Sequence, residues 1–416
     1  MSRMALEGIR VIACSVYLAG PKGTEMLAAL GAQVIKVEST KYFDGHRNIS
    51  IQPGDRYWNR SARFNTVNRS KYGLTLDLTH PRGKEIFKEL VKVSDVVFTN
   101  YPRRVMMNLG LDYPVLRELN PSIIMVSSAG LGHTGPWRDY VTYAWVVNSL
   151  CGMAELTGYP DGPPAVIPDG MCDAVPASYT ALAILLALRH RRRTGLGQHI
   201  DLGQCETLMV GLGEQFMDYT MNRRLQTRHG NHHPSMAPHN IYRCKGDDEW
   251  VAIAVSSDEE WAALCKVTGN PQWARDEKFS GALSRWNNQA ELDRLIAGWT
   301  VNRDKRQVME ALQKAGVPAG GVLKTDQNLD DPHLRGKGYW YWCDADPGMD
   351  GAHPYAGLAI GLSKTPARFE KPAPALGQDN DFVLGDMLGI SGEEMAKLAQ
   401  EHVIGNEPYQ YRQRAI

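Results

Sequence analysis

Residues 9–38, IRVIACSVYLAGPKGTEMLAALGAQVIKVE, decide the fold of this chain. Ile9–Cys14 is a short apolar run of strand length, and Gln33–Glu38 (QVIKVE) is a second one. Between them, Thr24–Leu30 has helical spacing, and Gly31 is the residue type that commonly ends a helix. A strand, a helix and a second strand at this spacing predict a parallel βαβ unit with a right-handed crossover.

The same alternation continues through the first third of the chain. Lys84–Val93 has helical spacing, and Ser94–Asn100 (SDVVFTN) is strand-like. Val115–Leu119 is helical, and Ser122–Ser127 (SIIMVS) is a further strand. The pattern predicts an α/β fold with a Rossmann-like sheet, in which ligands bind at the carboxyl ends of the strands.

The second half of the chain has a different texture. Asp173–Arg193 is a long apolar helix, and the polar stretch Asn222–His233 reads as a linker. Beyond it, the strand Trp250–Val255 is followed by amphipathic helices, which indicates a separate, smaller unit containing helices and strands.

Composition excludes several classes of protein. The 416 residues contain 46 Lys and Arg against 46 Asp and Glu, so a polybasic nucleic-acid binder is not expected. The N-terminus lacks the apolar core of a signal peptide, and apolar runs look shorter than the roughly 20 residues that span a bilayer. The seven Cys are scattered without a C-x-x-C pair. We therefore expect a cytoplasmic protein with reduced thiols and no contact with membranes.

Most local signatures of chemistry are missing from the sequence. It contains no P-loop, no G-x-G-x-x-G after the first strand, no G-x-S-x-G elbow and no H-E-x-x-H. His232 and His233 are adjacent in a loop, and neighbouring side chains seldom converge on one ion. No metal site is predicted.

Asp173 has two compatible interpretations. It opens the long apolar helix, where aspartate commonly serves as the N-cap. A carboxylate kept ionised by a helix N-terminus is also a usable nucleophile toward an acyl group.

Three basic segments leave alternatives open. The segments 68–71 (NRSK) and 100–104 (NYPRR) place cations near the ligand-binding edge of the predicted sheet, either as a solvated patch or as a binding site. The run 189–193 (RHRRR) ends the apolar helix, where basic residues most often offset the helix dipole.

Several stretches together resemble the family III CoA-transferases, which include formyl-CoA transferase and carnitine CoA-transferase. The matching stretches cover nearly the whole chain in order. They include Leu6–Ile12, Ala19–Pro21, Leu27–Glu38, Asn68–Lys71, Thr157–Pro164, Arg193–Asp201, Ala315–Gly320 and Ala373–Gly377. No single stretch is decisive, but the ordered set is highly specific.

The resemblance implies a Rossmann-like large domain and a smaller α/β domain, joined by long linkers. Two chains would interlock as a homodimer, with CoA between the large domain of one chain and the small domain of the other. The implied boundaries are 1–205 for the large domain, 206–230 for a linker, 231–325 for the small domain, and 326–416 for a return linker and the C-terminal part of the large domain.

The resemblance also implies functional residues. The catalytic aspartate falls on Asp173, with Asp169 as the second choice. The expected CoA-phosphate arginine falls on Asn108, and Arg103 and Arg104 stand close enough to replace it. The remaining residues implied to contact CoA or the site are Tyr17, Leu18, Ala19, Lys71, Asn100 and Tyr143.

The implied activity is acyl-CoA:carboxylate CoA transfer through aspartyl anhydride and aspartyl-CoA thioester intermediates on Asp173. Acyl-CoA and a small carboxylic acid would be the substrates, and no prosthetic group is needed. The segment 230–236 stands where formyl-CoA transferases carry a glycine flap, which argues against a small acceptor such as oxalate.

An α-methylacyl-CoA racemase on the same fold is the main alternative. A racemase needs two acid–base groups on opposite faces of the α-carbon. The positions of its histidine and second aspartate fall on Tyr143 and Ala144, which favours transfer. A catalytically silent CoA-binding protein is a third possibility, which the aspartate disfavours.

Overall fold

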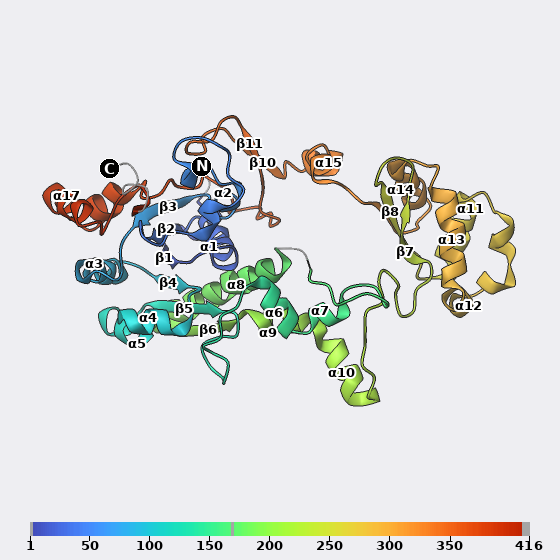
Figure 1. Cartoon of the computed structure of the whole chain (residues 1–416), viewed down its shortest axis with the longest axis horizontal. Helices are drawn as coiled ribbons and strands as arrows, with labels where there is room; N and C mark the ends of the chain where they lie inside the picture. Colours follow the sequence, from blue (N-terminus) through green and yellow to red (C-terminus); the bar gives the residue numbers. More distant parts are fainter. Residues whose placement is uncertain (1–2, 168–169, 410–416) are drawn as a thin grey trace. The chain divides into compact units, whose positions relative to one another are not determined.

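The computed structural model describes residues 3–167 and 170–409. The chain divides into two compact units (Figure 1). The larger unit is formed by Met1–Ala154, Val166–Arg224 and Arg335–Ile416, and the smaller unit by Glu155–Ala165 and Leu225–Leu334.

A six-stranded parallel sheet forms the centre of the larger unit (Figure 1). Its strands run in the order β3-β2-β1-β4-β5-β6, which is the order of the Rossmann fold. The central strand β1 pairs on both sides, since Ile12 lies opposite Ile35 of β2 and Val97 of β4. The predicted α/β fold with a parallel sheet is confirmed. The strands are β1 (Arg10–Cys14), β2 (Gln33–Glu38), β3 (Lys71–Thr75), β4 (Val96–Thr99), β5 (Ile124–Ala129) and β6 (His199–Gly203).

Helices α1 (Ala19–Ala29) and α8 (Met171–Thr194) cover one face of this sheet. Leu27 of α1 and Ile184 of α8 are fully buried against strand residues that include Val34. Successive strand residues point to opposite faces, so the apolar run of β2 supplies both faces of a sheet that is covered on both sides.

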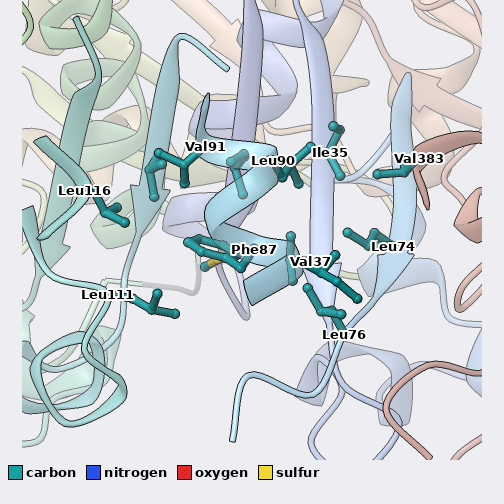
Figure 2. Packing of buried hydrophobic residues seen from close by; sticks show 14 of the residues in the cluster. Ile35, Val37, Leu74, Leu76, Phe87, Leu90, Val91, Leu111, Leu116 and Val383 are labelled. Atoms are coloured by element: carbon teal, nitrogen blue, oxygen red, sulfur yellow. The ribbon is translucent and has the colours of Figure 1, made fainter. Parts of the chain in front are cut away.

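The other face is covered by α3 (Pro81–Lys92), α4 (Arg103–Leu109) and α5 (Tyr113–Leu119). Figure 2 shows Phe87, Leu90 and Val91 of α3 packed against the strands. Ile35, the neighbour of Val34, belongs to this second core. Each fully buried side chain of this size contributes about 1.5–3 kcal/mol of burial free energy.

Helix α8 corrects one expectation from the sequence. Its most apolar 18 residues have a mean hydropathy of 1.6, so by length and composition alone it could cross a membrane. One third of that stretch is buried, and core helices of soluble proteins pass the same test. The long apolar stretch is therefore weak evidence for a membrane-spanning segment.

The C-terminal segment returns to the edge strand β3. Backbone N–H groups of Gly73 and Thr75 donate to the side chains of Asp379 (2.6 Å) and Asn380 (2.9 Å). The segment continues into a π-helix, Asp381–Met387, whose Val383 belongs to the core shown in Figure 2, and into α17 (Gly392–Gln400).

The larger unit also contains short elements between these main ones. The segment expected as a linker at 206–230 contains two helices, α9 and α10. The short elements are η1 (Gly45–Asn48), η2 (Tyr57–Asn59), α2 (Ala62–Asn65), α6 (Ala144–Leu150), α7 (Met153–Leu156), α9 (Gln204–Met209), η3 (Val210–Leu212), α10 (Gly213–Asn222), β10 (Trp340–Cys343) and β11 (His353–Ala356).

The smaller unit is built on a three-stranded antiparallel sheet in the order β7-β8-β9. Its own core contains Val251, Trp261, Phe279, Leu292 and Ile296. Its elements are β7 (His239–Arg243), β8 (Trp250–Ala254), α11 (Asp258–Val267), η4 (Gln272–Arg275), η5 (Glu277–Phe279), α12 (Ala282–Asn287), α13 (Gln289–Thr300), α14 (Lys305–Lys314), β9 (Ala319–Gly321), α15 (Thr325–Leu329) and, at its end, α16 (Pro332–Gly336).

Candidate active site

A cavity of about 620 Å³ opens in the larger unit beyond the carboxyl ends of β1, β4 and β5. The strand order reverses between β1 and β4, which is where open α/β sheets bind ligands. The first turn of α8 contributes Asp173 to the wall. Other lining residues include Val16, Tyr17, Leu18, Ala19, His46, Ile49, Arg63, Asn100, Tyr101, Arg138, Tyr140, Tyr143, Ala144 and Trp145.

Asp173 is half-buried and is the third residue of α8. The N-cap interpretation is wrong, because the N-cap residue is Gly170, whose φ is 116°. A carboxylate in the first turn is nevertheless favoured by the positive end of the helix dipole. Asp173 thus lies in the first turn of α8 and also forms part of the cavity wall. The alternative nucleophile, Asp169, lies outside the described residues.

The loop after β1 is held in place by two side chains. Asn100, which follows β4, accepts from the N–H of Val16 at 3.0 Å and donates to its carbonyl oxygen at 2.8 Å. The next N–H, that of Tyr17, donates to the Asp44 carboxylate at 3.0 Å. The predicted residues Tyr17, Leu18, Ala19 and Asn100 thus lie together at one side of the cavity.

Lys71 has a structural role in place of the predicted contact with CoA phosphates. Its side chain is fully buried, and its ammonium group donates to the carbonyl oxygens of Pro21 and Val67 and to Oδ1 of Asn68. Burial lowers the pKa of Lys71, and the nearby charge of Lys36 lowers it further. No donor is left to reach a ligand, because an ammonium group has three.

The predicted arginines are not among the residues that line this cavity. Arg104 is exposed, and Arg103 lines a second cavity of about 340 Å³. The cations that do line the main cavity are Arg63 of α2 and Arg138. Sequence reasoning missed both, although Arg138 directly follows Trp137, in a stretch dense in aromatic residues.

Tyr143 is part of the wall of the main cavity. Its ring meets that of Tyr17 edge to face, with 5.7 Å between centroids. Trp137 and Tyr140, a few residues earlier in the chain, stack on each other with 5.9 Å between ring centroids, and both are exposed. An aromatic rim of this kind offers apolar contact area to an acyl or pantetheine chain.

The second cavity contains a histidine pair that the sequence did not suggest. Nε2 of His199 lies 2.9 Å from the Ser127 hydroxyl, and His133 lies 6.4 Å from His199 between ring centroids. Burial lowers the pKa of both histidines. Both imidazoles are therefore favoured in their neutral form at neutral pH.

His232 and His233 belong to the smaller unit. Nε2 of His232 lies 2.9 Å from the Asp293 carboxylate on α13, and the carbonyl of His233 accepts from the Trp286 indole at 3.0 Å. Within residues 3–167 and 170–409, no group of three His, Cys, Asp or Glu side chains is placed to hold a metal ion. The 230–236 segment is thus anchored to its own unit on two sides.

Comparison with known proteins identifies the class. The family model "CoA-transferase family III" matches residues 6–380, so the chain belongs to that family and the predicted resemblance is confirmed. It is an enzyme of the CoA-transferase class, whose substrates are CoA thioesters.

Individual relatives are similar over nearly their whole length. Succinyl-CoA–D-citramalate CoA-transferase of Chloroflexus aurantiacus is 34% identical over 96% of this chain and 98% of its own. Succinate–glutarate CoA-transferase of Agrobacterium fabrum is 33% identical over 92% and 96%. A CaiB/BaiF family protein from Brucella suis matches in structure with a TM-score of 0.84 and 31% identity, covering 92% of this chain and 100% of that one.

Proposed function

We propose that this enzyme moves CoA from a donor thioester to an acceptor carboxylic acid, with Asp173 as the nucleophile. One observation carries the proposal. Among the described residues that line the cavity, Asp173 is the only carboxylate, and it stands in the first turn of a helix. An ionised carboxylate beside a helix N-terminus can attack an acyl carbon without a separate base.

An acyl group stays activated at each step, either as a thioester or as a mixed anhydride. A carboxylate oxygen of Asp173 attacks the thioester carbon, the C–S bond breaks, and a mixed anhydride and the CoA thiolate result. The thiolate then attacks the aspartyl carbonyl carbon, which releases the donor acid and leaves an aspartyl-CoA thioester. The acceptor carboxylate attacks this thioester, and the same two steps run in reverse. Holding thiolate and acid in place is an orientation effect, for which intramolecular models give about 7–11 kcal/mol.

We assign a dicarboxylic acid to at least one side of the exchange. Arg63 and Arg138 line the cavity together with Asp173, so a second carboxylate on the acyl group would find a cation there. The names of two relatives support this class, because they specify succinyl-CoA with D-citramalate and succinate with glutarate.

CoA itself is assigned to the loop after β1 and its surroundings. Tyr17, Leu18, Ala19, Asn100 and Tyr143 line the cavity, which supports their assignment as contacts. Arg103 and Arg104 remain proposed phosphate ligands on the neighbouring helix α4.

We further propose that two chains form an interlocked homodimer in the cytoplasm. The proposed domain boundaries are 1–205 for the large domain, 206–230 for a linker and 231–325 for the small domain, and residues 326–416 return to the large domain. Exposed apolar side chains support an interface in the larger unit. They are Leu182, Leu185 and Leu186 on α8 and Phe216, Met217 and Met221 on α10. Exposed apolar patches of this kind mark association surfaces. Light scattering should give about twice 46.3 kDa.

Trapping the intermediate tests the function. The enzyme is incubated with succinyl-CoA, then treated with hydroxylamine or borohydride, and the modified peptide is mapped by mass spectrometry. Modification should fall on Asp173. Modification of Asp169 or of a cysteine, with Asp173 untouched, would overturn the assignment.

A further inference from the structure

The backbone of Tyr17 is in an unusual conformation. Its φ is 63°, in the left-handed region, which a bulky aromatic residue adopts only at a cost of about 1–3 kcal/mol. Eight described non-glycine residues have positive φ, and Tyr17 is the one that also lines the main cavity. Strain of this kind persists only where the surroundings over-determine it.

A buried ion pair holds Tyr17 in that conformation. One oxygen of Asp44 accepts from the N–H groups of Tyr17 and His46, each at 3.0 Å. The other oxygen lies 2.6 Å from Nζ of Lys36, and both side chains are fully buried. Burial alone would raise the pKa of Asp44, but Lys36 and these hydrogen bonds keep it lowered. The acceptor is thus a fixed, ionised carboxylate.

The packing around Tyr17 fixes the direction of its side chain. A Cβ placed on Gly45 would come within 2.8 Å of the Tyr17 ring, so only glycine lets the ring lie there. The ring meets His46 and Tyr143 edge to face, at 5.6 and 5.7 Å between centroids. Asn100 clamps the preceding residue, Val16, through both of its backbone groups.

The phenol of Tyr17 is a neutral donor that solvent and substrate can reach. The residue is 39% exposed and shares the cavity with Asp173. Burial raises the pKa of Tyr17, and Tyr143 and Asp44 raise it further. The hydroxyl therefore keeps its proton at neutral pH and can donate a hydrogen bond to developing negative charge.

We propose that Tyr17 is a further catalytic residue: its hydroxyl donates a hydrogen bond to the thioester carbonyl oxygen as Asp173 adds to the carbonyl carbon. The inference rests on the proposed function. As the C–O bond forms, the carbonyl electron pair moves onto that oxygen, and the hydrogen bond strengthens. When the C–S bond breaks, the carbonyl forms again, and the proton stays on Tyr17 throughout. The strained loop holds the donor in place before the substrate binds, so no reorganisation is needed during the step.

Tyr17→Phe tests this, because it removes the hydroxyl and keeps the ring. The rate constant for acylation of Asp173 by succinyl-CoA, measured by rapid quench and mass spectrometry, should fall about 10²-fold, as for loss of one oxyanion donor. KM for succinyl-CoA should change less than about threefold, because uniform binding is retained. The matched control is Tyr42→Phe, at a tyrosine that is 83% exposed, which should acylate at the wild-type rate.

The amplitude of the acylation reaction counts folded sites, so partial misfolding of the variant lowers the amplitude and leaves the rate constant interpretable. An acylation rate constant within threefold of wild type would overturn the role of Tyr17. That result would leave the proposed function standing if Asp173 is still the residue acylated. Acylation elsewhere than Asp173 would overturn the proposed function and, with it, this inference.

Discussion

Five of the cations in residues 36–71 fall into two groups that the sequence alone does not separate. Lys36, Arg47, Arg69 and Lys71 are fully buried, whereas Arg63 lines the cavity. The first three buried cations each meet a buried carboxylate: Lys36 meets Asp44, Arg47 meets Glu38 and Arg69 meets Glu25.

The difference lies in the acceptors that surround each cation. A buried charge is tolerated only when it is paired or hydrogen-bonded, and protein acceptors take all three donors of Lys71. A cation near a binding edge is therefore a ligand candidate only if it lines the cavity. The basic segment 68–71 supports the loop behind the site, and the cavity wall takes its cations from Arg63 and Arg138.

Among substitutions of residues that line the cavity, Asp173→Asn should lower the turnover rate most. The amide cannot form the anhydride, so kcat should fall at least about 10³-fold, which is roughly 4 kcal/mol of barrier. CoA affinity should be retained when measured by calorimetry. Asp161→Asn, at an exposed aspartate of the smaller unit, is the control and should keep wild-type turnover. Residual activity above a tenth of wild type would remove Asp173 as the nucleophile.

Lys71→Met should affect stability, because it removes three hydrogen bonds to buried acceptors. The free energy of unfolding should fall by about 3 kcal/mol, measured by urea denaturation. Lys397→Met, whose side chain is 73% exposed, should change it by less than about 0.5 kcal/mol.

The pH dependence of the same variant sharpens the assignment. Folding lowers the pKa of Lys71, so the unfolded chain binds this proton more tightly. Stability therefore rises with pH between the lowered folded pKa and the unfolded value near 10.5. Lys71→Met should lose this contribution. A variant of normal stability with a raised KM for acyl-CoA would return Lys71 to the CoA site.

Arg63→Gln should change specificity more than rate. A charge-assisted hydrogen bond is worth about 1.5–3 kcal/mol, so KM for succinyl-CoA should rise about tenfold or more. KM for butyryl-CoA, which lacks the second carboxylate, should stay within twofold. Arg56→Gln, at an exposed arginine of the same segment, is the control. An equal rise in KM for both thioesters would show that Arg63 does not bind the distal carboxylate.

The sequence predicts the sheet well because βαβ alternation is a local pattern, and it places Asp173 correctly at the start of α8. It fails where the deciding partner is remote in the chain. Pro21, fifty residues away, takes a hydrogen bond from Lys71. Asp44 is 27 residues from Tyr17. Neither contact leaves a periodic signal.

Three further features could not be predicted from the sequence: the position of Arg63, the N-cap of α8 and the exposure of α8. Arg63 lies on α2, a helix of four residues, which is too short to produce helical periodicity in the sequence. The N-cap of α8 is Gly170. Asp173, which the capping preference of aspartate suggested for that position, lies three residues further into the helix. The exposure of α8 is likewise a property of packing, since the buried Ala181, Ile184 and Ala187 lie among three exposed leucines, Leu182, Leu185 and Leu186.

For the racemase alternative, we expect no measurable reaction. With a chiral 2-methylacyl-CoA in deuterated water, no deuterium should appear at the α-carbon, measured by NMR. A racemase needs a second acid–base group facing Asp173, and the structure places Ala144 and Tyr143 in the cavity wall at the positions in question. A tyrosine side chain is a poor base for this step, because its oxygen already carries a proton. His232 could supply such a base only by leaving Asp293, which it contacts at 2.9 Å. Rapid α-deuteration that His232→Ala or His233→Ala abolishes would place the chemistry with the racemases.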